Sequence, residues 1–250
     1  MKLLIEKKTS LVDKKAFETI KAQVKQKPDS LIGLAVGKTT DGLYKLISRD
    51  VLKSPIQWKK VKLFQIDENL GTSPDSLISF NHEVRQELNP LLKLVNPKNV
   101  FLIDGTKNPK LIIKEAYKFI KKNKGIDLII LGLGPIYDPH IAYNTTGKSS
   151  LNSKMRVVDL HPKITKKLKS KSLSLSVTAK YLKGITVGIK DILESKKALL
   201  IAYGKDKARS VSLTLNGKVN MSKASASALV LHKDLTVILD KAASKYLITT

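Results

Sequence analysis

Residues 127–134 read Asp-Leu-Ile-Ile-Leu-Gly-Leu-Gly, a short apolar run that ends in two closely spaced glycines. Such a run is typical of a strand in a parallel sheet, because helices cover both faces of that sheet. Similar runs rich in Ile, Leu and Val recur along the chain and alternate with helix-like stretches. The alternation predicts an α/β fold with a mostly parallel sheet and helices on both faces.

The same pattern predicts the individual elements. The predicted strands are Leu31–Val36, Val61–Ile66, Val100–Ile103, Asp127–Leu131, Arg156–Leu160, Ala198–Ala202 and Leu235–Leu239. The predicted helices are Leu11–Gln26, Asp41–Val51, Ser79–Leu88, Pro109–Lys122, Ile185–Leu193 and Asp206–Leu215. No internal repeat and no linker rich in Pro, Gly or Ser interrupts them. We therefore expect residues 1–250 to form one Rossmann-like domain.

The composition limits the compartment and the membrane partners that we expect. The chain has no Cys, which excludes disulfides and thiolate metal sites and fits a reducing compartment. Only three consecutive apolar residues stand near the N-terminus before charge returns, far fewer than a signal peptide needs. No apolar run approaches the roughly 20 residues that cross a bilayer. We expect a cytoplasmic protein with no membrane partner.

The net charge of +25 raises the question of a polyanionic partner. The positive charge comes from 42 Lys and only four Arg, whereas base reading and bidentate phosphate contacts favour Arg. Aromatic residues, at 5%, are too few for a platform on which bases stack. We expect a solvated lysine-rich surface and no specific nucleic-acid partner; a polyanion partner is the alternative.

The segment Gly37-Lys38-Thr39-Thr40 follows one predicted strand and precedes a helix. Its backbone N–H groups, its hydroxyls and the helix dipole suit an anion, so we predict a phosphate-binding loop. The alternatives are a helix N-cap without a ligand and a nucleotide-binding loop. The spacing argues against a nucleotide, since that motif needs four residues between its glycines and only three separate Gly33 from Gly37.

Two carboxylates, Asp67 and Glu68, end an apolar strand. A carboxylate at this place acts as a general base when partial burial raises its pKa. The alternative is a structural role, in which the side chain caps or braces the loop.

A third polar segment, residues 132–144, contains Asp138 and His140. A carboxylate two residues from an imidazole can orient it and stabilise its charge near neutral pH. Metal binding is the alternative, but the other three histidines show no ligand spacing relative to His140. All three polar segments follow strands, so we expect them to meet at one edge of the sheet.

Five segments together resemble the glucosamine-6-phosphate deaminase and 6-phosphogluconolactonase superfamily. They stand in the order of that superfamily, and with residues 228–240 the likeness covers nearly the whole chain. Residues 67–71 and 140–144 are more similar to the deaminase branch, also called glucosamine-6-phosphate isomerase. The five segments are residues 32–44, 64–71, 127–144, 184–189 and 203–208.

The resemblance implies an enzyme that converts glucosamine 6-phosphate, or a related amino-hexose phosphate, and water to fructose 6-phosphate and ammonia. His140, oriented by Asp138, would open the pyranose ring, and Asp67 would move a proton between C2 and C1. Lys207 and residues 37–40 would hold the phosphate. The resemblance implies neither a metal nor an organic cofactor. It leaves the oligomeric state open between a monomer and a homo-oligomer, either dimer or hexamer.

The chain departs from the deaminase pattern at several positions near the predicted site. Thr145 stands where those enzymes carry a Glu after the residue that matches Asn144. A hydroxyl cannot stabilise an imidazolium or share its proton as a carboxylate does, so Glu68 or Asp138 alone would have to support His140. The other departures are the longer loop 135–137, Pro139 for Gly, Asn69 for Tyr and Lys38 for a small residue.

These departures leave alternative functions open. They are a deaminase of a different hexose phosphate such as galactosamine 6-phosphate, a weak deaminase, and a sugar-phosphate-binding homologue without turnover. Another sugar-phosphate isomerase or a lactonase is a further alternative. Arg156 and Ser149-Ser150 resemble part of the allosteric site of some deaminases, but Val158 stands near an expected Lys. We therefore expect weak or absent activation by an acetylated sugar phosphate.

Overall fold

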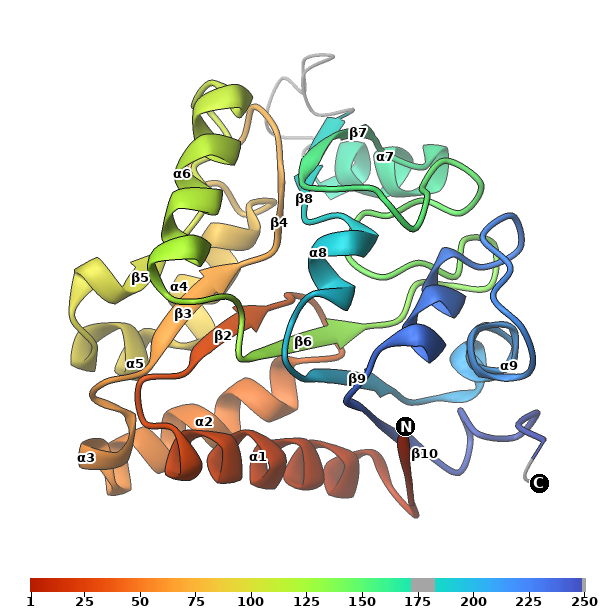
Figure 1. Cartoon of the computed structure of the whole chain (residues 1–250), viewed down its shortest axis with the longest axis horizontal. Helices are drawn as coiled ribbons and strands as arrows, with labels where there is room; N and C mark the ends of the chain where they lie inside the picture. The colour runs from red at the N-terminus through yellow and green to blue at the C-terminus, as the bar shows by residue number, and fades with distance from the viewer. Residues whose placement is uncertain (172–182, 249–250) are drawn as a thin grey trace.

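Seven parallel strands form the central sheet of the computed structural model, which describes residues 1–171 and 183–248 (Figure 1). In order across the sheet, the strands are β1 (Lys2–Glu6), β10 (Leu235–Asp240), β9 (Ala198–Ala202), β6 (Leu128–Gly132), β2 (Leu31–Leu34), β3 (Lys62–Gln65) and β5 (Val100–Phe101). Every neighbouring pair is parallel. The predicted fold class is confirmed, although the composition gave no sign of the edge strand β1.

A second, smaller sheet corrects two predictions. Its antiparallel strands are β4 (Asp67–Asn69), β8 (Lys183–Thr186) and β7 (Arg156–Asp159), in that order. The predicted strand at Arg156–Leu160 exists, but it belongs to this sheet. The helix predicted over Ile185–Leu193 was wrong in its first part, because residues 183–186 pair with strands on both sides. Only α8 (Ile189–Leu193) is helical there.

The helices lie on both sides of the central sheet, with α1 to α3 below it and α6 and α8 above it in Figure 1. The prediction missed the short helices α3, α5 and α7, whereas α6 matches its predicted range. The helices besides α8 are α1 (Thr9–Gln26), α2 (Asp41–Lys53), α3 (Pro55–Trp58), α4 (Phe80–Glu87), α5 (Asn89–Leu94), α6 (Pro109–Lys122), α7 (Pro162–Lys171) and α9 (Ala208–Leu215). The 3₁₀-helices are η1 (Pro97–Asn99), η3 (Lys205–Lys207) and η4 (Ser225–Leu231).

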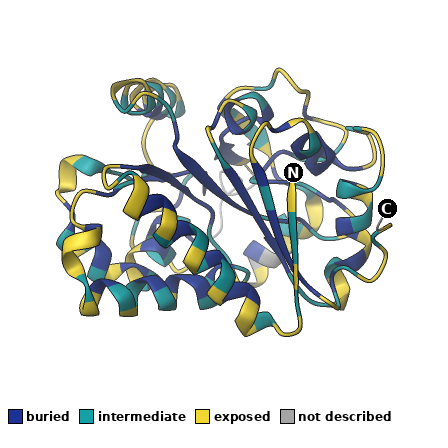
Figure 2. Ribbon diagram, turned by 60° about the horizontal axis from the view of Figure 1, so that its bottom comes forward, coloured by how far each residue is buried: buried dark blue, intermediate teal, exposed yellow. Residues whose placement is uncertain are grey.

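Alternate residues of each central strand pack into two separate hydrophobic cores, one on each face of the sheet. In β6, Ile129 and Leu131 pack with α6, α8 and η4, whereas Leu128 and Ile130 pack with α1 and α2. Successive side chains of a strand point to opposite faces, so a sheet covered on both sides needs apolar residues on both faces of its strands. Figure 2 shows the result, with buried strands inside and exposed residues on the outer sides of the helices.

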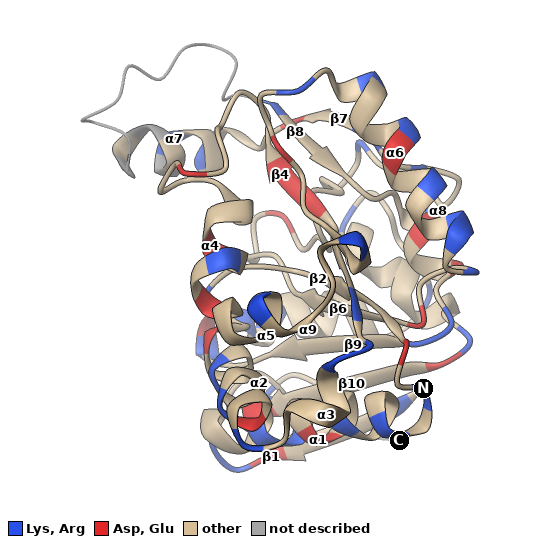
Figure 3. Cartoon of the chain, turned by 90° about the vertical axis from the view of Figure 1, so that its left-hand side faces the viewer, with Lys and Arg blue, Asp and Glu red and all other residues tan. Residues whose placement is uncertain are grey.

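The lysine-rich composition is visible on the surface. In Figure 3 basic residues are scattered over many helices and loops of the face that is drawn, rather than gathered in one stripe. Within residues 1–171 and 183–248, none of the helices combines the length and the apolar character that a membrane span requires.

Candidate active site

A cavity of about 410 Å³ opens at the carboxyl ends of β2, β6 and β9. In parallel α/β sheets this is the edge at which ligands bind. The three polar segments singled out in the sequence all contribute to it, as expected. The lining residues are Ala35, Val36, Gly37, Lys38, Thr39, Thr40, Asp67, Phe80, Glu83, Gly132, Leu133, Gly134, Pro135, Tyr137, His140, Ala142, Tyr143, Ile164, Leu168 and Lys207.

The loop from Gly37 to Thr40 connects β2 to α2 at the cavity wall. Gly37 has a φ of +130°, a backbone conformation that residues other than glycine rarely adopt. The Thr40 backbone N–H and its hydroxyl both donate to the Gly37 carbonyl, at 2.8 and 2.9 Å. The Thr40 side chain makes no cap hydrogen bond to α2. The first-turn N–H groups of this 13-residue helix therefore depend on other acceptors.

His140 and Asp138 form a hydrogen-bonded pair in the loop after β6. His140 Nδ1 lies 2.8 Å from Asp138 Oδ2, and the Thr146 backbone N–H donates to Asp138 Oδ1 at 2.8 Å. Burial raises the pKa of Asp138. The hydrogen bond and the charge of His140, together with the hydrogen bonds from Thr146, outweigh this effect and hold the pKa of Asp138 below its ordinary value. Asp138 is thus an ionised partner for the imidazole.

A close backbone approach shapes this loop. The Gly134 N–H donates to the His140 carbonyl at 2.7 Å. A Cβ at Gly134 would lie 2.4 Å from the Asp138 carbonyl oxygen and 2.6 Å from the His140 nitrogen. Only glycine permits this contact, so the Gly-Leu-Gly run that ends the strand also sets the position of the imidazole.

Asp67 begins β4 and lines the cavity from another side. Its side chain is buried, with 6% of the residue exposed. Burial, followed by the negative charges of Glu68 and Glu83, raises the pKa of Asp67 from 3.8 to about 8. A carboxylate with this pKa is a competent proton acceptor near neutral pH.

Glu68, next in the chain, has a different environment and does not line the cavity. Its carboxylate is fully buried and accepts five hydrogen bonds, so it cannot also support His140. It instead ties β4 to the start of α4. The donors are the Gln65 side-chain amide, the Ser79 hydroxyl and the backbone N–H groups of Asn69, Phe80 and Asn81. Burial raises the pKa of Glu68, and these hydrogen bonds oppose that rise.

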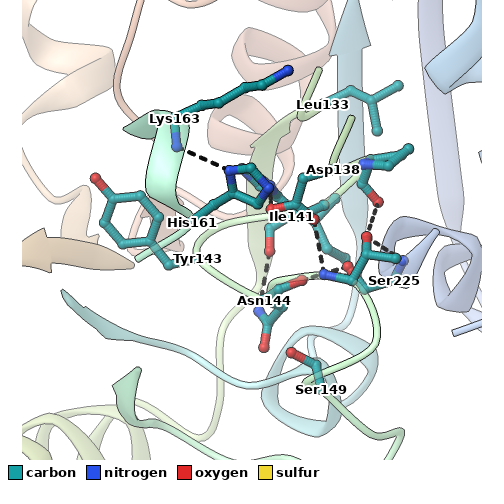
Figure 4. Close-up of polar contacts among 12 residues, drawn as sticks. Leu133, Asp138, Ile141, Tyr143, Asn144, Ser149, His161, Lys163 and Ser225 are labelled. Carbon is teal, nitrogen blue, oxygen red and sulfur yellow. Dashed lines mark hydrogen bonds and ion pairs between the residues drawn. The ribbon is translucent and has the colours of Figure 1, made fainter. Parts of the chain in front are cut away.

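Asn144 and Thr145, the other two supporting candidates, are not among the residues that line the cavity. Asn144 is fully buried, and its side-chain amide donates to the Ile141 and Val187 carbonyls at 3.0 and 2.9 Å. Figure 4 shows it beside Ile141 and near Ser225, whose hydroxyl donates to the Asn144 carbonyl. Thr145 lines a separate hollow of about 200 Å³ with Arg156. Asn144 therefore braces the loop.

Lys207 comes from η3 after β9, and its Nζ donates to the Leu133 carbonyl at 2.7 Å. It therefore bridges the loops that follow β9 and β6.

Several lining residues were missed in the sequence, among them Glu83 and Phe80 of α4, and Tyr143, whose ring stacks on Phe80 at a centroid distance of 5.6 Å. Phe80 and Glu83 lie in the helix predicted over Ser79–Leu88, and Tyr143 lies in the polar segment 132–144, but neither pattern singled these residues out.

Three carboxylates form the one group, among the residues described, whose geometry could hold a metal ion. Oxygen atoms of Asp41, Glu83 and Glu87 lie within 4.8 Å of one another. Burial, and then hydrogen bonding to Asp41 and its charge, raise the pKa of Glu87 to about 8. A proton shared between the side chains accounts for the proximity without a metal.

Comparison with known proteins identifies the family of the chain. Residues 6–237 match the family model for glucosamine-6-phosphate isomerases/6-phosphogluconolactonase. The chain belongs to this family. A glucosamine-6-phosphate deaminase of Clostridium botulinum is 36% identical over 250 residues, 98% of each chain. One from Thermoanaerobacter sp. is 34% identical over 251 residues, 98% of this chain and 94% of the relative.

Solved structures of the glucosamine-6-phosphate isomerase/6-phosphogluconolactonase family share the fold. A monomeric glucosamine-6-phosphate deaminase superposes with a TM-score of 0.87 at 26% identity, covering 99% of this chain and 100% of its own. A 6-phosphogluconolactonase from Trypanosoma cruzi has a TM-score of 0.77 at 20% identity, covering 99% and 97%. The lactonase likeness concerns the fold alone.

Proposed function

We propose that this protein is a glucosamine-6-phosphate deaminase, an enzyme of amino sugar metabolism that releases ammonia and forms fructose 6-phosphate. The observation that carries the proposal is that Asp67, His140, Lys207 and the loop 37–40 line one cavity of about 410 Å³. A hexose phosphate fits a cavity of this volume. The deaminase relatives, at 34% and 36% identity over nearly the whole chain, support the same substrate class.

The phosphate would bind where the cavity offers cations and backbone donors. Lys38 and Lys207 line this part, and the N-terminus of α2 begins directly after Thr40. Uncapped N–H groups and the positive end of the helix dipole stabilise a phosphate. Binding at this place would leave the sugar carbons to extend toward Asp67 and His140.

Ring opening is the first chemical step that we assign. His140 Nε2, the ring nitrogen that does not face Asp138, would take the proton of the O1 hydroxyl and deliver a proton to the ring oxygen O5. The C1–O5 bond breaks, and the free 2-amino aldehyde forms. Asp138 holds the ring in place and stabilises the imidazolium that forms transiently.

Asp67 would then move one proton. Its ionised carboxylate takes the proton from C2, and the resulting carboxylic acid returns it to C1, while O1 takes up one proton and the C2 amine gives up one by exchange with water. The product is an imine at C2, which water hydrolyses to the ketose and ammonia. A pKa of about 8 suits both halves of this transfer, because the group accepts and donates a proton at similar pH.

The test is release of ammonia and fructose 6-phosphate from glucosamine 6-phosphate by the purified protein. Galactosamine 6-phosphate and 6-phosphogluconolactone are assayed in parallel, and Asp67→Asn serves as the blank. Turnover of glucosamine 6-phosphate above the blank is the expected result. Turnover of only one of the other two substrates would replace the assignment with that activity.

A second candidate function is sugar-phosphate binding without turnover, and Thr145 is the observation that favours it. The deaminase pattern has a Glu at that position, and Thr145 lies outside the lining of the cavity. If no substrate is turned over and calorimetry still detects binding of glucosamine 6-phosphate, this candidate would be supported and the assignment as a deaminase would be wrong.

A further inference from the structure

One hydrogen bond joins the two loops to which we assign phosphate binding. The Tyr203 hydroxyl, in the loop after β9, donates to the Lys38 carbonyl, in the loop between β2 and α2, at 2.6 Å. The loop after β9 also carries Lys207. Residues of both loops line the cavity, but Tyr203 itself is not among them. Tyr203 therefore holds the wall of the cavity from outside the lining.

The backbone next to Tyr203 is fixed to the end of β10. The Gly204 N–H donates to both oxygens of the Asp240 carboxylate, at 3.0 and 3.1 Å, and the Ala243 N–H donates to the same carboxylate at 2.7 Å. The Tyr203 ring packs against the hydrophobic core that lies between the central sheet and helices α1 and α2. The hydroxyl is thus presented to Lys38 from a well-supported position.

The Tyr203 hydroxyl keeps its proton at neutral pH. Burial, followed by the negative charges of Asp13, Asp41 and Asp240, raises the pKa of Tyr203 to about 12. A protonated phenol can donate one hydrogen bond, and the Lys38 carbonyl can only accept one. The direction of this hydrogen bond is therefore fixed.

The hydrogen bond also sets the orientation of the peptide group between Lys38 and Thr39. None of the peptide bonds among the described residues is cis, and a trans peptide directs its C=O and its N–H to opposite sides. The carbonyl faces Tyr203, so the Thr39 N–H points away from Tyr203, and Thr39 is a residue that lines the cavity. Within residues 1–171 and 183–248 this N–H donates to no protein acceptor.

We propose that Tyr203 is a positioning residue, which holds the Lys38–Thr39 peptide so that the Thr39 N–H donates to the phosphate of the substrate. This inference rests on the proposed function for the place of the phosphate. Without the hydroxyl, the peptide can rotate and turn its carbonyl oxygen toward the phosphate, which repels it. An N–H that is already oriented before binding lowers the cost of ordering the loop.

The experiment removes the hydroxyl in Tyr203→Phe and keeps the packed ring. Calorimetry at pH 7 measures the Kd for inorganic phosphate and for glucitol 6-phosphate, an unreactive open-chain analogue of the substrate. We expect both Kd values to rise by the same factor, about fivefold, because one hydrogen bond to the shared phosphate is weakened. Tyr117→Phe is the matched control and should change neither Kd, since its hydroxyl bonds Asp191 and the Met155 N–H outside the cavity lining.

Amide NMR measures the Thr39 N–H directly. In the wild-type protein, saturating inorganic phosphate should move the Thr39 amide proton downfield, as a hydrogen bond to a charged acceptor does. In Tyr203→Phe the shift at saturation should be smaller. A purely structural role would leave this shift unchanged, because the bound loop would still present the same N–H.

Three results would overturn the proposal. They are unchanged Kd values in Tyr203→Phe, a larger loss for glucitol 6-phosphate than for inorganic phosphate, and no phosphate-induced shift of Thr39 in the wild-type protein. If Tyr203→Phe does not fold, the wild-type shift decides.

Failure of this inference is distinguishable from failure of the proposed function. A protein that turns over no substrate, but loses phosphate affinity in Tyr203→Phe as expected, contradicts the deaminase and supports the positioning role. A protein that turns over glucosamine 6-phosphate with unchanged Kd values in Tyr203→Phe supports the deaminase and contradicts the positioning role. A protein that binds neither phosphate ligand contradicts both.

Discussion

Two aspartates at opposite ends of the central sheet lie next to similar apolar strands and have opposite properties. Asp127 precedes β6 at the amino end, where Lys27 and Lys196 bind its carboxylate at 2.5 and 2.7 Å. Burial raises the pKa of Asp127, but these hydrogen bonds outweigh it and hold the pKa below its ordinary value. Asp67 follows β3 at the carboxyl end, where burial and neighbouring carboxylates raise its pKa to about 8.

The comparison shows that burial alone does not make a carboxylate reactive. Asp127 is 2% exposed and Asp67 is 6% exposed, so the two differ little in solvent contact. They differ in what is added to burial: at Asp127 the hydrogen bonds of two lysines outweigh its effect on the pKa, whereas at Asp67 burial is the largest cause of the raised pKa and neighbouring carboxylates add to it. The amino end of a parallel sheet can therefore use a buried aspartate for stability, while the carboxyl end uses one for proton transfer.

The largest expected effect is on Asp67. Asp67→Asn should lower kcat about 10³-fold, because a proton carrier is lost, while the Kd for glucitol 6-phosphate stays within about threefold. Steady-state kinetics and calorimetry measure the two quantities. Loss of binding together with turnover would contradict the assignment of Asp67 as the base.

The opposite outcome is expected at Asp127. Asp127→Ala should lower the free energy of unfolding by about 2 kcal/mol at pH 7, since the carboxylate loses its hydrogen bonds from Lys27, Lys196 and the Leu31 N–H, and leave kcat unchanged. The pKa of Asp127 is lowered by folding, so this stabilisation is present above the unfolded pKa and disappears as the pH falls through the folded pKa. Urea unfolding at pH 7 and pH 3.5 measures it; an equal loss at both pH values would disprove the charge contribution.

Asp67 should show the reverse pH dependence. Its folded pKa of about 8 lies above the unfolded value, so its contribution to stability is full below about pH 4 and is lost as the pH rises to about 8. Asp67→Asn should therefore gain stability relative to the wild type between pH 5 and pH 8.5.

In the wild type, kcat/KM should fall about tenfold per pH unit below pH 8, as the base is protonated. A flat profile between pH 6.5 and 8 would argue against the raised pKa.

The smallest effect is expected at Thr145. Thr145→Glu restores the carboxylate of the deaminase pattern, but the residue lines the hollow with Arg156 and not the cavity with His140. We expect kcat to change by no more than about twofold. An increase of tenfold would show that a carboxylate at this position reaches the imidazole when the substrate is bound.

The fold was predictable where local pattern and tertiary environment agree. Runs rich in Ile, Leu and Val identified six strands of the central sheet, because a strand covered on both faces is mostly apolar. The prediction failed at β8 and β4, which pair in the second sheet. Residues 183–186 contain a glycine against Tyr143, where a Cβ would lie 2.8 Å from the ring, and that contact is invisible in the local pattern.

For the candidate site, the sequence by itself determined which loops meet: Gly37 to Thr40, Asp67 and His140 all follow strands that the pattern predicts, and parallel strands bring such loops to one edge. It also determined the Gly134 turn that brings Asp138 to His140. Only the tertiary structure decided the roles of the acidic residues. Glu68 lies under α4 and Glu83 lies in the cavity because the helix packs against β4, and these contacts depend on partners far along the chain. A carboxylate's pKa and its access to a ligand depend on such contacts rather than on its neighbours in sequence.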